Sequence, residues 1–392
     1  MLPRRIAVVT GSRADYGLLY WLIHDLYHAP DIELQLVVTG MHLMSRFGRT
    51  VDVIARDGFP IAATVNLGLD GDTPRAIARA IGEGTRGFAD AFDRLASDVV
   101  VILGDRFEAL AAATAAFAEC RPIAHIHGGE VTEGALDDGF RHAITKLSAL
   151  HFAAAEPYRQ RIIQMGEPPE RVFTVGAPGL EHLVRTPLLS RAELERALDF
   201  ELGDRALLVT FHPAILDEGS PAEQCAELLA ALDAFAECRV VLTLPNADAG
   251  GQSIIPMLED YARRHATRCR LFTSLGQQRY LSLLRCVAAV VGNSSSGIIE
   301  APSAGCVTVN IGNRQHGRLR AASVIDCAPC RSDIEAAIGR ALDPAFRATL
   351  HDVRNPYGSG DVASRMLEIL RSADLHALRR KSFHDLVVMS NA

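Results

Sequence analysis

The amino-acid sequence predicts an α/β protein made of two Rossmann-like domains, each built around a buried parallel sheet. Short β-branched runs are apolar at nearly every position, as in strands covered on both faces, and they alternate with longer amphipathic stretches. The series continues for about seven strands, pauses at residues 176–204 in a segment rich in proline and charge, and then starts again. The length of 392 residues also favours two domains.

Each expected strand of the first half is a short apolar run that ends in small or polar residues. These runs are residues 6–9, 34–39, 61–65, 99–103, 123–126, 150–153 and 172–175. The second half predicts strands at 207–211, 240–244, 270–272, 287–291, 307–310 and 324–325. Periodic stretches between the runs predict helices at 18–28, 75–96, 106–119, 221–235, 254–265 and 332–342.

These patterns divide the chain into a first domain at residues 1–180, a second at 181–365 and a tail at 366–392. The tail is expected either to pack on the first domain or to contact another subunit. Ligands of parallel α/β sheets bind at the carboxyl ends of the strands. We therefore expect the two domains to face each other across a cleft that polar groups from both halves line.

Composition and charge exclude several classes of partner. The formal net charge of −7 argues against nucleic acid or an anionic membrane as the main partner. The longest apolar stretch, residues 109–118, falls far short of the ~20 residues that cross a bilayer, and no signal-peptide pattern follows Arg5. The eight cysteines fit free thiols of a reducing compartment, so we expect a cytoplasmic protein.

The loop after residues 287–291 is rich in glycine and serine and precedes a predicted helix. Its backbone N–H groups suit a phosphate, and Ser294 and Ser295 could add hydroxyl donors. Glu300 could accept hydrogen bonds from a ribose, while His212 and Arg314 at neighbouring strand ends would offset the charge of a diphosphate. The alternative is an ordinary serine-rich helix cap. Neither GxGxxG nor GxxxxGK[ST] is present, and we expect no cofactor.

Carboxylates and imidazoles gather at the strand ends of the first half, with arginines among them. The residues are Asp105, His127, Glu130, Asp137, Asp138, His42, Arg13, Arg106 and Arg141. Neighbouring carboxylates have split pKa values, so one can act as a base while another holds a proton. Such a pair suits proton removal beside a glycosidic carbon with expulsion of a leaving group.

Other uses of these residues are open at this point. Asp105 could form an ion pair with Arg106 that covers the strand end, and Asp137 or Asp138 could cap a helix at 139–147. His125, His127, Glu130 and His142 could in principle bind a metal. We expect no metal, because the histidines flank Ile126 on one strand in an apolar context.

Six motifs in order resemble the UDP-N-acetylglucosamine 2-epimerase family, specifically its hydrolysing branch of the sialic-acid and legionaminic-acid pathways. They are GSRADYGLL (11–19), VTGMHL (38–43), LGDRFEAL (103–110), HIHGGEVTEGALDDGFRHAITK (125–146), GNSSSGIIEAPSAG (292–305) and IGNRQHGR (311–318). The resemblance spans about residues 4–370. Asp15 favours the hydrolysing branch, because the non-hydrolysing branch usually carries lysine in this first motif.

The resemblance implies a GT-B fold and a two-stage reaction on a UDP-activated 2-acetamido sugar, without NAD or a catalytic metal. Elimination of UDP would give a glycal, and hydration with inversion at carbon 2 would release the free manno-configured sugar. The substrate would be UDP-N-acetylglucosamine or UDP-N,N′-diacetylbacillosamine. A homodimer or homotetramer is also implied. A GT-B glycosyltransferase and a non-catalytic UDP-sugar binding protein are the alternatives.

The resemblance also assigns residues to roles. Arg13, Asp15, His42 and Arg106 fall at positions for phosphate and sugar; His212, Ser294, Ser295, Glu300 and Arg314 fall at positions for UDP; Asp105 and the pair Asp137 and Asp138 fall at acid–base positions. Several relatives carry a catalytic glutamate where this chain has His127. Either His127 takes the proton-transfer role, or Glu130 rotates in, or water fills the gap; an imidazole suits base catalysis near neutral pH.

Overall fold

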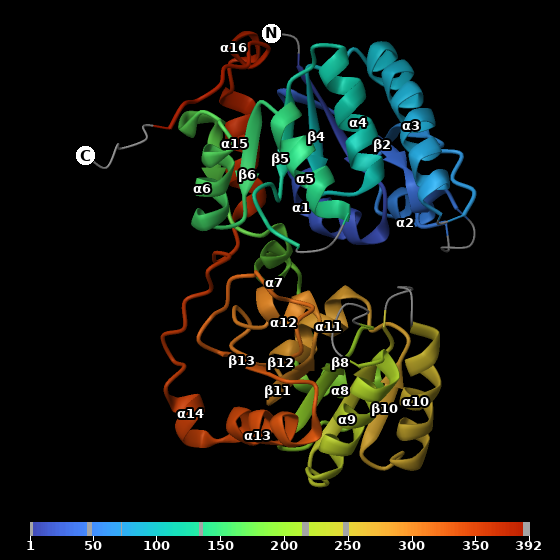
Figure 1. The fold of residues 1–392 in the computed structure, drawn as a ribbon, viewed down its shortest axis with the longest axis vertical. Coiled ribbons are helices and arrows are strands. Elements are labelled where there is room, and N and C mark those ends of the chain that lie inside the picture. Colours follow the sequence, from blue (N-terminus) through green and yellow to red (C-terminus); the bar gives the residue numbers. More distant parts are fainter. Residues whose placement is uncertain are drawn as a thin grey trace. The chain divides into compact units, whose positions relative to one another are not determined.

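The computed structural model describes residues 3–44, 49–71, 73–132, 136–213, 219–245 and 251–386. The chain forms two units, Met1–Glu181 with Gly360–Ala392, and His182–Ser359 (Figure 1). Each unit is a parallel sheet covered by helices, which confirms the expected fold class. The division places residues 360–365 with the first unit rather than with the second.

The sheet of the first unit has the strand order β3-β2-β1-β4-β5-β6-β7, and its paired strands run parallel. Its strands are β1 (Arg4–Thr10), β2 (Ile32–Thr39), β3 (Ile61–Val65), β4 (Val99–Leu103), β5 (Ile123–Ile126), β6 (Leu150–Ala153) and β7 (Val172–Thr174). The strand order reverses between β1 and β4. The loops after these two strands therefore flank the switch point where such sheets bind ligands.

Helices cover both faces of this sheet. They are α1 (Arg13–His28), α2 (Val51–Arg56), α3 (Pro74–Leu95), α4 (Phe107–Ala118), α5 (Leu136–Leu147), α6 (Glu156–Gln164), α15 (Val362–Ser372) and α16 (Leu375–Leu378), with 3-10 turns η1 (Gly40–Leu43), η3 (Pro169–Arg171) and η4 (Pro178–Leu180). In β1, Ile6 and Val8 pack against α1 and α15, whereas Ala7 and Val9 pack with α3 and α4. Burial on both faces explains why the strand is apolar throughout.

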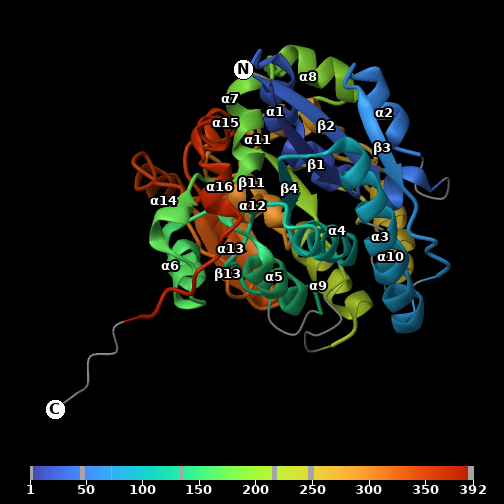
Figure 2. The same cartoon turned by 90° about the horizontal axis from the view of Figure 1, so that it is seen from above.

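Helix α15 returns from the second unit to pack against α1 (Figure 2). Glu181, at the start of α7 (Glu181–Arg185), accepts hydrogen bonds from the backbone N–H groups of Val362 and Ala363 at 2.5 and 3.3 Å. Arg365 donates to the backbone carbonyls of Thr174 and Val175. These contacts hold the start of α15 beside the end of the first sheet.

The sheet of the second unit has the order β10-β9-β8-β11-β12-β13, and its paired strands are also parallel. The strands are β8 (Ala206–Thr210), β9 (Arg239–Thr243), β10 (Cys269–Phe272), β11 (Ala289–Gly292), β12 (Val307–Ile311) and β13 (Val324–Cys327). The helices are α8 (Arg191–Leu198), α9 (Pro221–Asp233), α10 (Gly251–Arg264), α11 (Gln277–Leu284), α12 (Ser295–Ile299), α13 (Arg331–Leu342) and α14 (Pro344–Ala348). The switch point lies between β8 and β11. Within the described ranges, no helix is long and apolar enough to cross a bilayer.

Candidate active site

The loop after β1 leads directly into α1, which begins five residues earlier than the periodicity predicts. The hydroxyl of Ser12 accepts a hydrogen bond from the backbone N–H of Asp15 and caps the helix. Arg13 and Asp15 therefore lie in the first turn of α1, beside the switch point, and Arg13 is exposed. Burial and the negative charge of Glu108 raise the pKa of Asp15 to about 6, while Arg106 and Ser12 lower it.

Glu108 is a site residue that the sequence reasoning missed. Its side chain is 3% exposed, and its Oε1 accepts a hydrogen bond from Arg106 Nε at 2.6 Å. The ion pair considered between Asp105 and Arg106 is therefore wrong, because Arg106 pairs with Glu108. The sequence does contain a signal for Glu108, because it is the only charged residue of α4.

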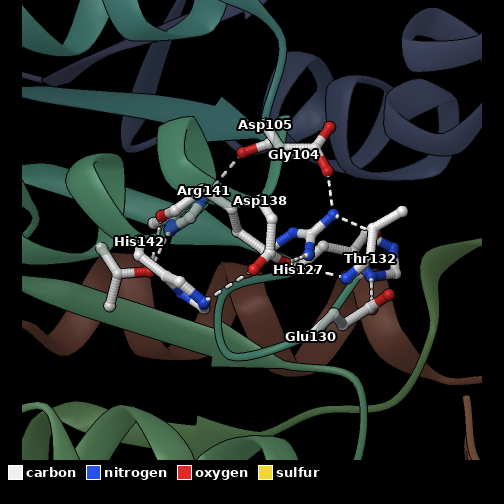
Figure 3. A network of polar contacts seen from close by, with 10 residues as sticks. Gly104, Asp105, His127, Glu130, Thr132, Asp138, Arg141 and His142 are labelled. Carbon is white, nitrogen blue, oxygen red and sulfur yellow. Dashed lines mark hydrogen bonds and ion pairs between the residues drawn. The ribbon is translucent and has the colours of Figure 1, made fainter. Parts of the chain in front are cut away.

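Asp105 follows β4 and belongs to a network centred on Arg141 of α5 (Figure 3). The buried Arg141 donates from Nη2 to Asp105 and to the Thr132 hydroxyl, and from Nη1 to Asp138 Oδ1 at 2.9 Å. Asp138 Oδ1 also accepts the backbone N–H of Thr132 at 2.8 Å. Arg141 thus fixes the strand-end aspartate to the start of α5 and to the loop before it.

Asp137 and Asp138 have different surroundings. Both lie within the first turn of α5, which begins at Leu136, so the expected helix cap immediately before residue 139 is wrong. Asp138 forms an ion pair with Arg141 through Oδ1, and its Oδ2 lies 3.4 Å from His142 Nε2. Partial burial and the charge of Asp105 raise the pKa of Asp137, which favours its protonated form.

His127 and Glu130 form a close pair beside this network (Figure 3). His127 directly follows β5 in the left-handed region, with φ of +66°, and its Nδ1 lies 2.5 Å from Glu130 Oε1. Gly129 also has positive φ, and a Cβ there would lie 2.3 Å from the carbonyl oxygen of Tyr158. This tight turn brings Glu130 back to the imidazole. Because a carboxylate only accepts hydrogen bonds, Nδ1 donates to Glu130, and in the neutral ring this leaves the lone pair on Nε2.

His125 and His127 lie in different environments. His125 is buried within β5, with Nε2 2.8 Å from the carbonyl of Gly104 and Nδ1 3.2 Å from the Thr145 hydroxyl. Burial lowers the pKa of His125 to about 3, so the ring is neutral. In the part of the chain that the structure describes, no group of three or more histidines, cysteines and carboxylates is arranged to hold a metal ion.

His42 lies in turn η1 after β2 and is fully buried. Its Nε2 is 3.0 Å from the Thr10 hydroxyl and its Nδ1 is 2.7 Å from the Thr50 hydroxyl. Burial lowers the pKa of His42 to about 4, so the imidazole is neutral at pH 7. His42 thus connects the ends of β1 and β2 beneath the site.

The second unit brings three of the expected strand ends together around Asn293. The buried Asn293 side chain accepts the backbone N–H of His212 at 2.7 Å and donates to its carbonyl at 2.8 Å. Arg314 and Gln315 both donate to the Asn293 carbonyl. Sequence reasoning missed Asn293 and Gln315, although both stand inside the quoted motifs. The loops after β8, β11 and β12 therefore form one connected group.

Glycine at position 292 is required for this arrangement. Its φ is +137°, and a Cβ would lie 1.9 Å from the carbonyl oxygen of Thr210. Ser294 then caps α12 by accepting from the backbone N–H of Ser296, Ser295 begins the helix, and Glu300 stands at its end. The serine cap that the sequence offers as the alternative is therefore present, and Ser294 forms it. The hydroxyl of Ser295 takes no part in this cap.

The chain is similar throughout its length to known sugar-nucleotide enzymes. The sequence model of the family described as UDP-N-acetylglucosamine 2-epimerase matches residues 24–371. A Campylobacter jejuni protein named GDP/UDP-N,N′-diacetylbacillosamine 2-epimerase (hydrolyzing) is 35% identical over 98% of this chain and 100% of its own. The Legionella pneumophila UDP-N,N′-diacetylbacillosamine 2-epimerase (hydrolyzing) is 36% identical over 95% and 97%. The solved Neisseria meningitidis UDP-GlcNAc 2-epimerase, bound to UDP-GlcNAc, has a TM-score of 0.73 at 18% identity, covering 94% and 100%, and shares the fold.

Proposed function

Because the chain belongs to the UDP-N-acetylglucosamine 2-epimerase family, we propose that it is a hydrolysing 2-epimerase of a UDP-2-acetamido sugar. The products would be UDP and the free manno-configured sugar. The observation that carries the proposal is the acid–base group of the first unit: Asp105 held by Arg141, Asp137 with a raised pKa, and the imidazole of His127 held by Glu130.

In the first stage of the proposed reaction, a base removes the proton from carbon 2. The electrons of that C–H bond form a double bond to carbon 1, and the bond from carbon 1 to the phosphate oxygen breaks, so that UDP leaves as an anion. We assign the base to His127 Nε2, because Glu130 accepts from Nδ1 and thereby orients the lone pair. In this assignment a histidine–carboxylate pair stands where the family resemblance implies a catalytic glutamate.

In the second stage, water adds across the double bond of the glycal. Its oxygen bonds to carbon 1 and gives up one proton to a carboxylate of the site, and carbon 2 receives a proton on the face opposite to the one that lost it. Asp137 suits this donation, because its raised pKa keeps the carboxyl protonated at higher pH than an ordinary aspartate. Asp105, fixed by Arg141, would assist the proton transfers at carbons 1 and 2.

We assign binding of UDP to the second unit. The backbone N–H groups and hydroxyls at Ser294 and Ser295 would take the diphosphate, with Arg314 and His212 beside them, and Glu300 would accept from the ribose. Arg13 and Arg106 of the first unit would contact phosphate and sugar. Two relatives, from Campylobacter jejuni and Legionella pneumophila, carry N,N′-diacetylbacillosamine in their names, so we propose UDP-N,N′-diacetylbacillosamine as the preferred substrate over UDP-N-acetylglucosamine.

Turnover of both sugar nucleotides, measured side by side, tests the proposal. Chromatography of the products should show UDP and free sugar in equal amounts without any acceptor, and Asp105→Asn should lower the rate about 100-fold or more. Product formation that needs an added acceptor would favour a glycosyltransferase. Binding without turnover, unaltered by Asp105→Asn, would favour a UDP-sugar binding protein. Either result would contradict the proposal.

The proposal also includes a homodimer or homotetramer and a cytoplasmic location, as the resemblance implies. Light scattering on the purified chain would give the mass of the assembly, and a monomeric mass at assay concentration would contradict the oligomer.

A further inference from the structure

The carboxylate of Glu108 at the start of α4 is buried with only part of its hydrogen-bonding capacity used. Its Oε1 accepts from Arg106 Nε at 2.6 Å, whereas its Oε2 is buried and has no hydrogen-bond partner among the described residues. Leaving a charged oxygen buried and unpartnered destabilises a fold. Glu108 is the only charged residue of α4. Because its burial does not help the core, we look for a function of this carboxylate in the site.

Two glycines make room for this carboxylate. A Cβ at Gly11 would lie 2.7 Å from Glu108 Cγ and 2.8 Å from its Oε1. A Cβ at Gly40 would lie 2.8 Å from the Gly11 carbonyl oxygen and 3.5 Å from Glu108 Oε1. The loops after β1 and β2 therefore close around a side chain supplied after β4. Glu108 therefore lies beside the carboxyl ends of β1 and β4 at the switch point and of the neighbouring β2.

Glu108 uses only one edge of the Arg106 guanidinium. Arg106 Nε is bonded to Glu108, and its terminal nitrogens make no hydrogen bond with the part of the chain described here. The side chain of Arg106 is 38% exposed. A guanidinium held at Nε presents its two terminal nitrogens as a fixed pair of donors, the geometry that suits a phosphate or a carboxylate.

Glu108 also acts on Asp15. Burial, the largest cause, and the negative charge of Glu108 together raise the pKa of Asp15 to about 6, against the lowering effects of Arg106 and Ser12. Asp15 is therefore protonated below about pH 6 and ionised above it. The negative charge of Glu108 also raises the pKa of Asp137, by less than burial and Asp105 do.

We propose that Glu108 is a positioning residue of the site, which holds Arg106 with its terminal nitrogens toward the UDP-sugar and keeps a fixed negative charge beside Asp15. The part that concerns the UDP-sugar rests on the proposed function. The part that concerns Asp15 does not, because it is a property of the unliganded protein.

The chain offers a matched control at the other end of the same helix. Arg121 Nε donates to Glu119 Oε2 at 2.7 Å, and Glu119 Oε1 is also buried without a partner among the described residues. Glu119→Gln therefore removes a carboxylate that is also two residues from its arginine, but 22% exposed and at the carboxyl end of α4, away from the site. Glu108→Gln and Glu119→Gln should destabilise the fold by similar amounts, and Glu108→Asp retains the charge if the glutamine variant folds poorly.

The ionisation of Asp15 is followed first, by NMR of protein with ¹³C-labelled aspartate carboxyls, assigned with Asp15→Asn. We expect the Asp15 midpoint near the same pH in the wild type and Glu119→Gln, and at least about half a unit lower in Glu108→Gln, because a neighbouring negative charge is gone. Glu108→Asp should keep most of the wild-type midpoint. An unchanged midpoint in Glu108→Gln would overturn the proposal, whatever the enzyme turns over.

Turnover of UDP-N,N′-diacetylbacillosamine at pH 8, where Asp15 is ionised in all variants, is measured second. Glu108→Gln should lower kcat/KM about tenfold or more, mostly through KM, while Glu119→Gln stays within about twofold of the wild type. Equal kinetics of Glu108→Gln and the wild type would contradict the positioning of Arg106. A wild type without turnover would refute the proposed function, and the NMR titration would still decide the role of Glu108 beside Asp15.

Discussion

His127 is the residue at which the proposed chemistry depends most on one side chain. The backbone holds it at positive φ, which is unfavourable for a residue with a side chain, and the Glu130 carboxylate fixes its ring. The imidazole is 14% exposed, so it is shielded but reachable. These constraints place a single oriented nitrogen at the end of β5, which is what a general base requires.

Replacement of His127 and of Glu130 separates the interpretation in which His127 is the base from the one in which Glu130 is the base. If His127 Nε2 is the base, His127→Ala should lower kcat about 100-fold or more. Glu130→Gln should lower kcat by a smaller factor, because the imidazole remains. Steady-state kinetics and titration of UDP binding measure both effects, and UDP binding should change little. A larger loss for Glu130→Gln than for His127→Ala would identify Glu130 itself as the base.

At this scale the sequence predicts the types of site residues better than their partners. It identifies Asp105, His127 and Asp137, because polar residues at the carboxyl ends of apolar strands are conspicuous. It offers Arg106 as an alternative ion-pair partner of Asp105, whereas Asp105 pairs with Arg141, 36 residues away. It also misses Glu108, since a glutamate in the first turn of a helix looks like an ordinary dipole-compensating residue.

The strands follow the sequence closely. β3, β4, β5 and β6 begin and end at the expected residues, whereas β1 and β2 each begin two residues earlier than expected. The apolar runs between polar loops locate the strands, because strands inside a covered parallel sheet are apolar at most positions. Helix α1 starts earlier than expected because Ser12 caps it, and no periodic apolar residue marks its first turn. The return of α15 to the first unit depends on contacts distant in sequence, which no local pattern reveals.

Glu181 is the residue that holds α15 in place, and its removal should destabilise the first unit. Glu181→Ala would leave the buried N–H groups of Val362 and Ala363 without their acceptor, at a cost of about 1–3 kcal/mol. Urea unfolding followed by the fluorescence of Trp21, the single tryptophan, reports on this unit because Trp21 packs in the same core.

Glu223→Ala provides the control for this measurement. Glu223 closes an exposed capping box at the start of α9 in the second unit, so its loss should cost less than about 1 kcal/mol and leave the Trp21 transition unchanged. A Glu181→Ala protein as stable as the wild type would show that α15 is held by its apolar face alone.

The whole molecule consists of two units with the same construction, and the proposed function divides the chemistry between them. Each is a parallel sheet whose strand order reverses once. The notable polar residues follow the strands at that reversal or the next strand along, since His127 follows β5 beside β4 and Arg314 follows β12 beside β11. The first unit carries the oriented carboxylates and the imidazole, and the second carries the serine loop organised by Asn293. The alternation of strands and helices predicts this architecture. The strand order decides which loops meet, and only the structure provides it.

Turnover in heavy water tests the central claim most directly. If carbon 2 loses its proton in the first stage and regains one from solvent in the second, the free sugar formed in D₂O should carry one deuterium at carbon 2, visible by NMR and mass spectrometry. The same experiment with Asp105→Asn should give little product, and what forms should be labelled alike. A free sugar that keeps its original hydrogen at carbon 2 would contradict the account.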